Sequence, residues 1–589
     1  MSNPPLRRSA RAASAKPEES AAAKAAAAKA TAAKDAPAKA AATKAAHAKT
    51  AAAKAATSET KKAAKPVGRT SSRNSKRAAS PEASPPPVAK RSRTKGAQSD
   101  TEDVKKPAKA PVARKPSATK VTRKPTQNGL AAVHEEPVQT KPYFNPLPTP
   151  PEHTRPANQI FVWGAGNFGQ FGWGADHLGE YSAPKRNTVI EAKMKEGVFG
   201  GEDAGLEAVA AGGLHTLFID EKGTIWSCGV NDDAALGRLT KDVPDPENPG
   251  SFLDVDELTA LPHPLQSLVD EKFRAVQIAA GDSISAAISS EGELKVWGSF
   301  RASEGSLGFS GGVRYEFLPK SILELPHKPG DSEKAVSVVS GNNHLLVLTT
   351  HGNIYTWGAG EQGQLGRKIL DRRKIHGTVP EKITLGARSN KAVLVGASNY
   401  SSFAVDENGD VWGWGLNTMG QTGTGVDEPR STSDEVHSPK KVESLSKKAL
   451  DGDKIVQITG GEHHTVFLTA SGKVYACGRC DGGQLGVSEE NGEYKNRSNP
   501  DFVDVPILVE FPDKDDPVVH ISAGTHNNMA VTQGGALYAW GDESQGELGV
   551  KEQEAKTPTE VVRKDGGSWT AISAACGGQH TMGMFRKKT

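Results

Sequence analysis

A regular array of lysines is the first feature of this chain whose residue type and spacing suggest a chemistry. Between Ser20 and about Lys65 the sequence is mostly Ala and Lys, and seven lysines follow a strict spacing of five: Lys24, Lys29, Lys34, Lys39, Lys44, Lys49 and Lys54. On an α-helix each step of five turns about 500°, so successive lysines lie about 140° apart and cover every side. The array therefore has no apolar stripe, and it predicts neither a packed helix nor a membrane-lying one. We expect it to bind the DNA backbone without reading base sequence; the alternative is a solvated spacer.

Two short basic clusters follow the array. They are Lys76-Arg77 and Lys90-Arg91-Ser92-Arg93, the second beginning thirteen residues after Arg77. This spacing is typical of a bipartite nuclear import signal, so an import receptor is an expected partner and the nucleus, on chromatin, the expected location. Lysine repulsion and Pro37 weigh against stable structure, so residues 1–155 are predicted to be a disordered basic tail.

Charge divides the chain into two parts of opposite sign. Residues 1–150 hold 31 Lys and Arg against 10 Asp and Glu, whereas the rest holds 42 against 59. The near-neutral total hides a basic tail joined to an acidic body. Such a molecule is expected to bind a polyanion with the first part and to present selective surfaces with the second.

Several kinds of chemistry lack their residues. There is no Gly-x-x-x-x-Gly-Lys-Ser/Thr loop for a nucleotide phosphate, and we find no convincing Ser/His/Asp constellation. Cys477-Gly-Arg-Cys480 has no second cysteine pair, which disfavours zinc. Four cysteines without a disulfide framework fit a reducing compartment, and no run of about 18 apolar residues suggests a membrane span. We expect no metal and no cofactor.

From Ile160 onward two signals recur, seven times each, at roughly 53 to 71 residues. The first is Trp-Gly or its equivalent, at Trp163, Trp226 to Gly229, Trp297, Trp357, Trp414, Cys477 and Trp540. The second is a glycine-led turn, often ending in His, at Gly212, Gly281, Gly341, Gly396, Gly460, Gly524 and Gly577. Short strands lead into and out of each turn, and no helical period is present. A period this long, built from short strands, predicts the blades of a β-propeller.

The ends of the repeat array predict how the propeller closes. Trp163 has no glycine-turn strand before it, and Ala571 to Phe585 has no Trp-Gly after it. The two halves complete one blade if the N-terminal strand pairs with the C-terminal strands, which removes the exposed edges. The prediction is an all-β, seven-bladed propeller over residues 156–589.

The repeats resemble those of the regulator of chromosome condensation family. Gly-Gln-Leu-Gly or its variant follows Trp-Gly at Gly363 to Gly366, Gly483 to Gly486 and Gly169 to Gly172, alongside the Gly-x-x-His-Thr turns. The resemblance covers residues 160–589. It implies a guanine-nucleotide exchange factor for the small GTPase Ran. Such a factor loosens the GDP bound to Ran with a projecting β-wedge and makes no covalent bond. The segment from Trp297 to Gly308 departs from its sister repeats where that family carries the wedge.

The resemblance also implies contact residues. Those for the GTPase are Arg301, Phe300 and Glu304 in the wedge, with Asp282, His463, His464, His580, Asn343 and Asn167. At the last two the family's exchange factors carry aspartates, so contacts are redistributed or exchange is weaker. Those for nucleosomal histones are Arg388 and Lys391.

Alternatives remain beside the exchange factor, which we expect to be a monomer. One is a chromatin-bound propeller scaffold without exchange activity, supported by Asn167 and Asn343. Another is a propeller enzyme with chemistry at the central channel, disfavoured for want of a carboxylate or metal cluster. His215 and His344, which recur at equivalent positions, are predicted to be structural and to bond a neighbouring blade's backbone.

Overall fold

The computed structural model describes residues 141–426, 434–551 and 554–589. The predicted lysine array and the basic import clusters lie outside the described residues, as does the rest of the predicted tail up to residue 140. The predicted propeller, from residue 156 onward, is described except for residues 427–433 and 552–553.

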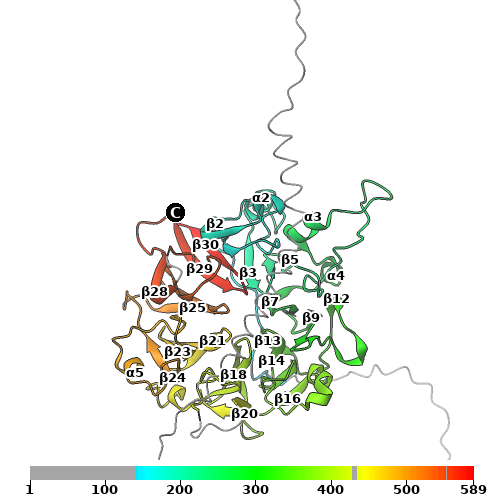
Figure 1. Ribbon diagram of the computed structural model, residues 1–589. Helices are drawn as coiled ribbons and strands as arrows, with labels where there is room; N and C mark the ends of the chain where they lie inside the picture. Colours follow the sequence, from blue (N-terminus) through cyan, green and yellow to red (C-terminus); the bar gives the residue numbers. More distant parts are fainter. Residues whose placement is uncertain (1–140, 427–433, 552–553) are drawn as a thin grey trace, which may run out of the picture. The chain divides into compact units, whose positions relative to one another are not determined.

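The described chain consists mainly of β-strands, which confirms the predicted all-β class, and most of the strands form antiparallel sets of four (Figure 1). A parallel pair, Ala397 with Thr459, joins two of these sets into one sheet. We call each set a blade. The first three blades are β3 (Leu206–Ala211), β4 (His215–Asp220), β5 (Ile225–Gly229) and β6 (His263–Pro264); β7 (Ala275–Ala280), β8 (Ile284–Ser289), β9 (Leu294–Gly298) and β12 (Glu316–Lys320); and β13 (Ala335–Ser340), β14 (His344–Thr349), β15 (Ile354–Gly358) and β16 (Glu381–Ile383). The next three are β17 (Ala392–Ala397), β18 (Ser401–Asp406), β19 (Val411–Leu416) and β20 (Glu435–Lys441); β21 (Ile455–Gly460), β22 (His464–Thr469), β23 (Val474–Arg479) and β24 (Phe502–Val509); and β25 (Val518–Ala523), β26 (Asn527–Thr532), β27 (Leu537–Asp542) and β28 (Glu554–Val562).

The remaining blade joins the two ends of the described chain. It is ordered β2 (Glu180–Arg186), β1 (Gln159–Ala165), β30 (His580–Lys587) and β29 (Trp569–Cys576). β1 pairs with β30 from Gln159 opposite Phe585 to Gly164 opposite His580. Strands from opposite ends of the sequence thus share one sheet, as the incomplete first and last repeats predicted.

The second strand of each blade explains the apolar runs in the sequence. β4, β8, β14, β18, β22 and β26 are buried at every residue. A strand covered on both faces by neighbouring blades loses the usual polar–apolar alternation. The Trp-Gly tryptophans lie in the same layer: Trp163, Trp297, Trp357, Trp414 and Trp540 are fully buried.

The innermost strands contact one another in a closed order. Contacts run from β3 to β7, β13, β17, β21, β25 and β29, and β29 contacts β3 again. The glycine-led turns after these strands are also linked by backbone hydrogen bonds: Gly213 N to Gly281 O, Asp282 N to Asn342 O, Asn342 N to Asn399 O, Asn399 N to Gly461 O, Glu462 N to Thr525 O and Gly578 N to Gly212 O, all between 2.8 and 3.1 Å. Thr525 Oγ1 donates to Gly578 O at 3.4 Å and completes the circuit.

Helices are short and lie in the connections between strands. They are α2 (Thr188–Lys195), α3 (Val255–Ala260), α4 (Gln266–Asp270) and α5 (Gly492–Lys495), with 3₁₀ turns η2 (Ala175–His177), η3 (Ser310–Gly312), η4 (Asp371–Thr378) and η5 (Glu443–Leu445). α2 starts where the Asn187 side chain accepts from Ile190 N at 2.9 Å, an N-cap that satisfies a free backbone donor. Among the described helices, none is long and apolar enough to cross a membrane.

The antiparallel order gives each blade two ends. The turn between the first and second strands lies at the same end as the loop between the third and fourth; we call this the glycine-turn face. The turn between the second and third strands lies at the other end.

Residues 141–155, which we call the strap, run along that second end. Phe144 N donates to Thr350 O, and the Asn145 amide donates to Thr349 O and Ala392 O at 3.0 Å each. Further along, Arg155 forms two hydrogen bonds with the Glu221 carboxylate at 2.8 and 2.9 Å. The sequence placed these residues in the tail. The structure instead packs them on this second end of the blades, which we call the strap face. Asn145 fixes them there by satisfying two strand-end carbonyls.

One repeated contact ties six of the third-to-fourth-strand loops to the next blade. The carbonyl at the Gln position of Gly-Gln-Leu-Gly accepts a hydrogen bond from the second residue of the next blade's second strand. The donors are Thr216 to Gln170 O, Ser285 to Ala235 O, Ser402 to Gln364 O, Thr465 to Gln421 O, Asn528 to Gln484 O and Thr581 to Glu547 O, at 2.6 to 2.9 Å.

The tryptophan of the next blade adds a second bond at four of these joints. Trp297 donates to Ala235 O, Trp414 to Gln364 O, Trp540 to Gln484 O and Trp163 to Glu547 O, at 2.8 to 3.2 Å. Where the repeat has cysteine, the thiols of Cys228 and Cys477 donate to Gln170 O and Gln421 O instead. Cys477 therefore takes the place of a tryptophan, as its sequence position suggested.

Candidate functional site

The segment that departs from its sister repeats forms a hairpin on the glycine-turn face. β10 (Arg301–Ala302) pairs with β11 (Gly305–Ser306), with Arg301 opposite Ser306 and Ala302 opposite Gly305. Gly305 closes the turn at a φ of 118°, a conformation that residues with a side chain rarely adopt. The hairpin stands between β9 and β12.

Phe300 anchors the base of the hairpin in the core. Its side chain is fully buried, 5.2 Å from the ring of Phe309, and it packs in the same cluster as Ile284 and Leu345. The prediction that Phe300 contacts a partner is therefore wrong. The resemblance placed Phe300 in the projecting wedge, but its side chain points into the core at the base of the hairpin.

Arg301 lies at the centre of a charged cluster. Its guanidinium is 2.6 Å from Asp233 and 3.8 Å from Asp282, and it keeps 41 % of its side-chain surface exposed. Its backbone N–H donates to Asn343 Oδ1 at 2.8 Å. The structure thus brings together three of the predicted residues, Arg301, Asp282 and Asn343. The Asn343 amide oxygen supplies the acceptor that the hairpin needs without adding a charge.

The tip of the hairpin is held by the neighbouring blade. Glu361 accepts from Ser303 N at 2.8 Å and from Ser303 Oγ at 2.6 Å. Lys374 of η4 bridges Glu361 at 2.6 Å and Glu304 at 2.9 Å. Hydrogen bonds to Glu361 and Glu304 raise the pKa of Lys374. Burial opposes ionisation of Glu361, but the bonds from Lys374 and Ser303 hold the pKa of its carboxyl below the ordinary value. Lys374 and Glu361 are therefore both charged near neutral pH.

Acidic side chains continue from the hairpin toward the middle of the glycine-turn face. Burial raises the pKa of Tyr400, and the negative charges of Glu462, Asp282 and Glu361 raise it further. Together with Asp233 they form an acidic arc beside Arg301. Such an arc favours a partner that brings lysine and arginine.

The predicted histidines divide into one that is accessible and two that are not. His463 is part-exposed and lies 3.9 Å from Glu462, which also faces His526 at 3.8 Å. Burial lowers the pKa of His463. His464 and His580 are fully buried. Their prediction as GTPase contacts is wrong, because the first residue of each second strand points between the blades.

The buried histidines bond the next blade instead. His215 pairs with Ser285 at 2.9 Å, His344 with Ser402 at 2.8 Å, His464 with Asn528 at 2.9 Å and His580 with Thr216 at 2.9 Å. Burial lowers the pKa of His215 and His464 to about 4 and of His344 and His580 to about 3, so all four are neutral. The predicted structural role of His215 and His344 is confirmed, although their partner is a side-chain hydroxyl rather than backbone.

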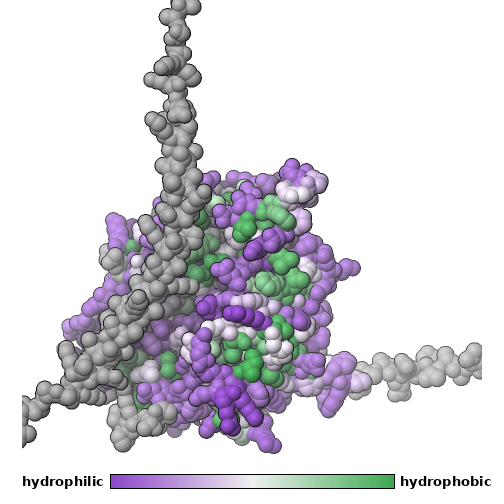
Figure 2. Space-filling model, turned by 45° about the vertical axis from the view of Figure 1, so that its right-hand side comes forward, coloured by the Kyte–Doolittle hydropathy of each residue, from purple (hydrophilic) through white to green (hydrophobic). Residues whose placement is uncertain are grey.

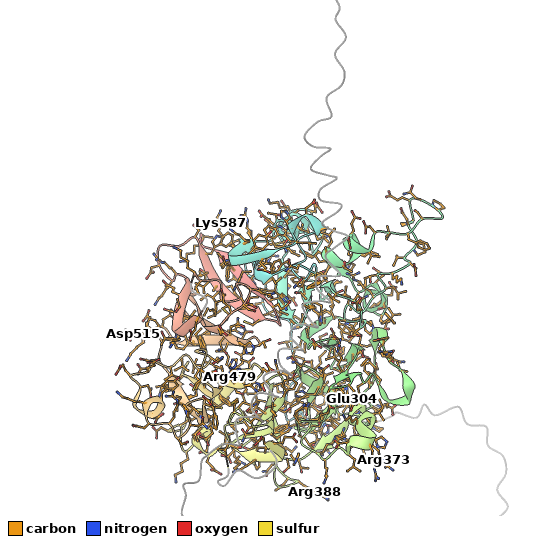
Figure 3. The ribbon with its side chains drawn as sticks, in the orientation of Figure 1. Glu304, Arg373, Arg388, Arg479, Asp515 and Lys587 are labelled. Carbon is orange, nitrogen blue, oxygen red and sulfur yellow. The ribbon has the colours of Figure 1, made fainter. Side chains whose placement is uncertain are left out.

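Three predicted residues lie away from the hairpin. Asn167 is exposed in the loop after β1. Arg388 and Lys391 lie in the connection from β16 to β17, at the strap face; Figure 3 shows Arg388 and, over a different part of the ribbon, Glu304 of the hairpin. Arg388 is exposed, whereas the Lys391 ammonium sits 4.8 Å from the centre of the Phe144 ring in the strap.

Sequence reasoning missed the partners that hold the hairpin: Asp233, Glu361 and Lys374. Asp233 and Glu361 occupy loops equivalent to the hairpin in the two flanking blades, and Lys374 lies in η4. The signal was present in the repeat alignment, since loops of adjacent blades share one face. It could be used only once blade order was known.

Comparison with known proteins adds a family to this geometry. The model of the RCC1-like domain matches residues 159–583. Protein pim1 of Schizosaccharomyces pombe is 32 % identical over 78 % of this chain and 80 % of its own length. The guanine nucleotide exchange factor SRM1 of Saccharomyces cerevisiae is 32 % identical over 72 % of this chain and 86 % of its own.

Solved structures of yeast Prp20 agree in fold. Prp20p from Saccharomyces cerevisiae, described with its binding to Gsp1p and histones, superimposes with a TM-score of 0.62 at 28 % identity, covering 76 % of this chain and 93 % of its own. Prp20 bound to Kap60 superimposes with the same score at 27 % identity, covering 80 % and 97 %.

Proposed function

The chain belongs to the RCC1-like domain family, and we propose from this premise that it is a guanine-nucleotide exchange factor for a Ran-type small GTPase. In this proposal the β10–β11 hairpin is the wedge that loosens bound GDP. A relative named as a guanine nucleotide exchange factor and the Gsp1p binding of Prp20p support the reaction type and the class of partner.

The observation that carries the wedge assignment is the difference between the hairpin and its sister loops. In the flanking blade the residues from Gly358 to Gly366 pack into the next blade, whereas Arg301–Ser306 forms a separate hairpin with Ser303 and Glu304 at its exposed tip. A short hairpin with a charged tip can enter a groove that a packed loop cannot reach.

The mechanism that we propose requires no covalent step. A partner that binds the nucleotide-free GTPase more tightly than the loaded one must weaken nucleotide affinity by the same factor. The hairpin would supply that preference by occupying space next to the phosphate-binding loop and the switch region. Arg301 and the acidic arc would hold the GTPase in register. GDP then leaves faster, and GTP enters because it is abundant in the cell.

We propose a nuclear, chromatin-bound setting for this reaction. Arg388 on the strap face would contact histones, a partner named for Prp20p, at the end of the blades opposite the hairpin. The Kap60 complex of Prp20 supports entry through an import receptor, with the basic clusters before residue 140 as the signal. A scaffold without exchange activity is the second candidate, because Asn167 is an exposed neutral side chain where the family's exchange factors carry a charge.

Release of a fluorescent GDP from a purified Ran-type GTPase tests the proposal. We expect the full chain to accelerate release strongly and Arg301→Ala to lower the catalysed rate at least about tenfold, since a central arginine at an interface contributes about 1.4 kcal/mol or more. Arg388→Ala is the matched control on the other face and should release GDP at the wild-type rate. No acceleration by the wild type would rule out the exchange function. Equal rates for wild type and Arg301→Ala would reject the hairpin as the wedge.

A further inference from the structure

The joint that follows the hairpin differs from the other joints between blades. At six joints among the described residues, a loop carbonyl accepts a bond from a hydroxyl or amide on the next blade. At the joint between the β7–β12 blade and the β13–β16 blade the donor position is Leu345, which has no polar side-chain atom. The loop that contains the hairpin therefore lacks this bond.

The tryptophan bond is also missing at this joint. Trp357 pairs with Leu345 across β14 and β15, as Trp414 pairs with Ser402 in the next blade. Trp414 donates to Gln364 O at 3.0 Å, but Trp357 Nε1 is buried and has no hydrogen-bond partner. A buried donor without a partner is costly and rare in native proteins, and it needs an explanation.

The histidine link is absent here too. The first residue of β8 is Ile284, where β4, β14, β22 and β30 begin with His. Ile284 and Leu345 lie in one apolar cluster with Phe300 and Trp357. Two polar positions that face each other at other joints are thus both apolar at this one.

The space around the loop glycines also shows that the hairpin loop stands apart from the next blade. A methyl group added to Gly363 or Gly366 would approach the next blade, to 3.1 Å from His437 and 2.9 Å from Trp414. At the corresponding Gly305 nothing lies within 4 Å, and at Gly308 the nearest atoms belong to Val313 and Arg314 of the same blade. The hairpin loop therefore does not rest on the neighbouring blade as its sister loops do.

What holds the hairpin is a set of surface contacts that a partner can reach. Asp233, Asn343 and Glu361 bond Arg301 and Ser303, and Lys374 bridges to Glu304. Arg301 and Glu304 keep 41 % and 77 % of their side-chain surface exposed, so a charged partner can reach one member of these ion pairs. On the buried side Phe300 packs in the core, and the buried Ser299 hydroxyl bonds Ser306 Oγ at 3.1 Å and donates to Arg314 O at 2.9 Å, both within the same blade.

We propose that Ile284 and Leu345 are positioning residues, whose lack of polar atoms leaves the β10–β11 hairpin without the buried joint bonds of its sister loops, so that it shifts as a unit when the GTPase binds. The hairpin turns on the buried Phe300, and the surface contacts reset it after release. This inference rests on the proposed exchange function for its role, but the mobility of the hairpin is a property of the chain alone.

Leu345→Thr and Leu345→Val in the full chain test the proposal. The two replacement side chains have the same shape, and only threonine can donate to the loop carbonyl as Thr216, Thr465 and Thr581 do. Backbone amide exchange of residues 299–308, followed by mass spectrometry without GTPase, is the first readout. We expect it to be several-fold slower in Leu345→Thr than in Leu345→Val. Equal amide exchange in the two variants would overturn the proposal.

GDP release is the second readout. We expect the kcat of Leu345→Thr to be several-fold below that of Leu345→Val, with KM for the GTPase changed less than twofold. A hairpin bonded to the next blade still binds the GTPase, but it cannot shift with it. Thr581→Val, which removes the tie to the loop carbonyl of Glu547, should speed amide exchange in residues 543–549 and leave kcat unchanged. Slower amide exchange with an unchanged kcat would overturn the positioning role. A wild type that releases no GDP refutes the exchange function itself and leaves the amide-exchange comparison intact.

Discussion

The joint between the closing blade and the β3–β6 blade and the joint beside the hairpin carry different residues at equivalent positions. Where β30 and β1 close the circle, Thr216 Oγ1 bonds both Gln170 O at 2.6 Å and His580 Nε2 at 2.9 Å. At the hairpin joint the equivalent positions hold Leu345 and Ile284, and no such bond forms. The hairpin joint keeps its apolar packing, the bond from Asp282 N to Asn342 O and the bonds between Gln277 and Val338, and these hold the two blades together. The polar side-chain bonds fix the position of each third-to-fourth-strand loop on the next blade, and the loop that contains the hairpin lacks them.

Acid should produce the largest effect, and it should act through the tied joints. His215, His344, His464 and His580 have pKa values of about 3 to 4 in the folded chain, against about 6.5 when unfolded. Below about pH 6.5 the histidines of the unfolded chain bind protons, whereas those of the folded chain do not. The free energy of unfolding therefore falls as the pH is lowered. We expect a loss on the order of 1 kcal/mol or more per histidine between pH 7 and pH 5, measured by urea unfolding.

A substitution taken from the chain itself isolates one histidine. His580→Asn places there the residue that Asn527 provides at the start of β26. This variant should lose about a quarter of the histidine-linked pH dependence and little of its stability at pH 5. Glu543 acts in the opposite direction, because burial raises the pKa of its carboxyl to about 7 and favours the folded state in acid. An unchanged pH slope in His580→Asn would contradict the assignment.

Removing the indole N–H should change the free energy of unfolding differently at the two kinds of joint, by less than the effect of acid. Trp163→Phe loses the bond to Glu547 O at 2.8 Å, whereas Trp357→Phe loses none. The two substitutions remove the same aromatic surface from equally buried sites. We expect Trp163→Phe to cost about 1–2 kcal/mol more in free energy of unfolding, measured from urea midpoints. Equal costs would mean that Trp357 has a partner after all.

The smallest effect should come from the exposed tip of the hairpin. Glu304 is 77 % exposed and shares Lys374 with Glu361, so Glu304→Gln should leave the urea midpoint unchanged. Glu361→Gln weakens the contacts with Ser303 as well and should lower the midpoint measurably. A larger shift for Glu304→Gln than for Glu361→Gln would show that the tip, not its base, fixes the hairpin.

The sequence predicted the strands and the hairpin because both leave a local record. Each blade repeats its Trp-Gly and its glycine turn, and the hairpin breaks that record between Trp297 and Gly308. Side-chain direction leaves no such record: His463 and His464 are neighbours, yet one is accessible and the other lies between blades. The partners of Arg301 were equally hidden, since Asp233 is distant in sequence and is brought near only by the packing of blades.

The exposed apolar side chains did not mark the site either. Phe252, Leu239 and Leu318 are among the most exposed, at 62 %, 59 % and 51 %; the first two lie in the connection from β5 to β6 and the third in β12. Figure 2 shows apolar patches separated by polar surface on the face in view. Single apolar residues of this kind are ordinary on protein surfaces, whereas the information at this site lies in charge and in a missing bond.

The hydrogen-bonded circuit of glycine turns has a consequence for how the molecule unfolds. A linear stack of repeats has two terminal units that lack a neighbour and therefore fray first. Here β29 contacts β3 as β3 contacts β7, so no innermost strand is terminal. Opening any one joint costs the contacts of a whole interface without exposing a weak end from which melting could spread. The inner strands should therefore be lost together, in a single cooperative step, while the hairpin opens and closes within the intact circle.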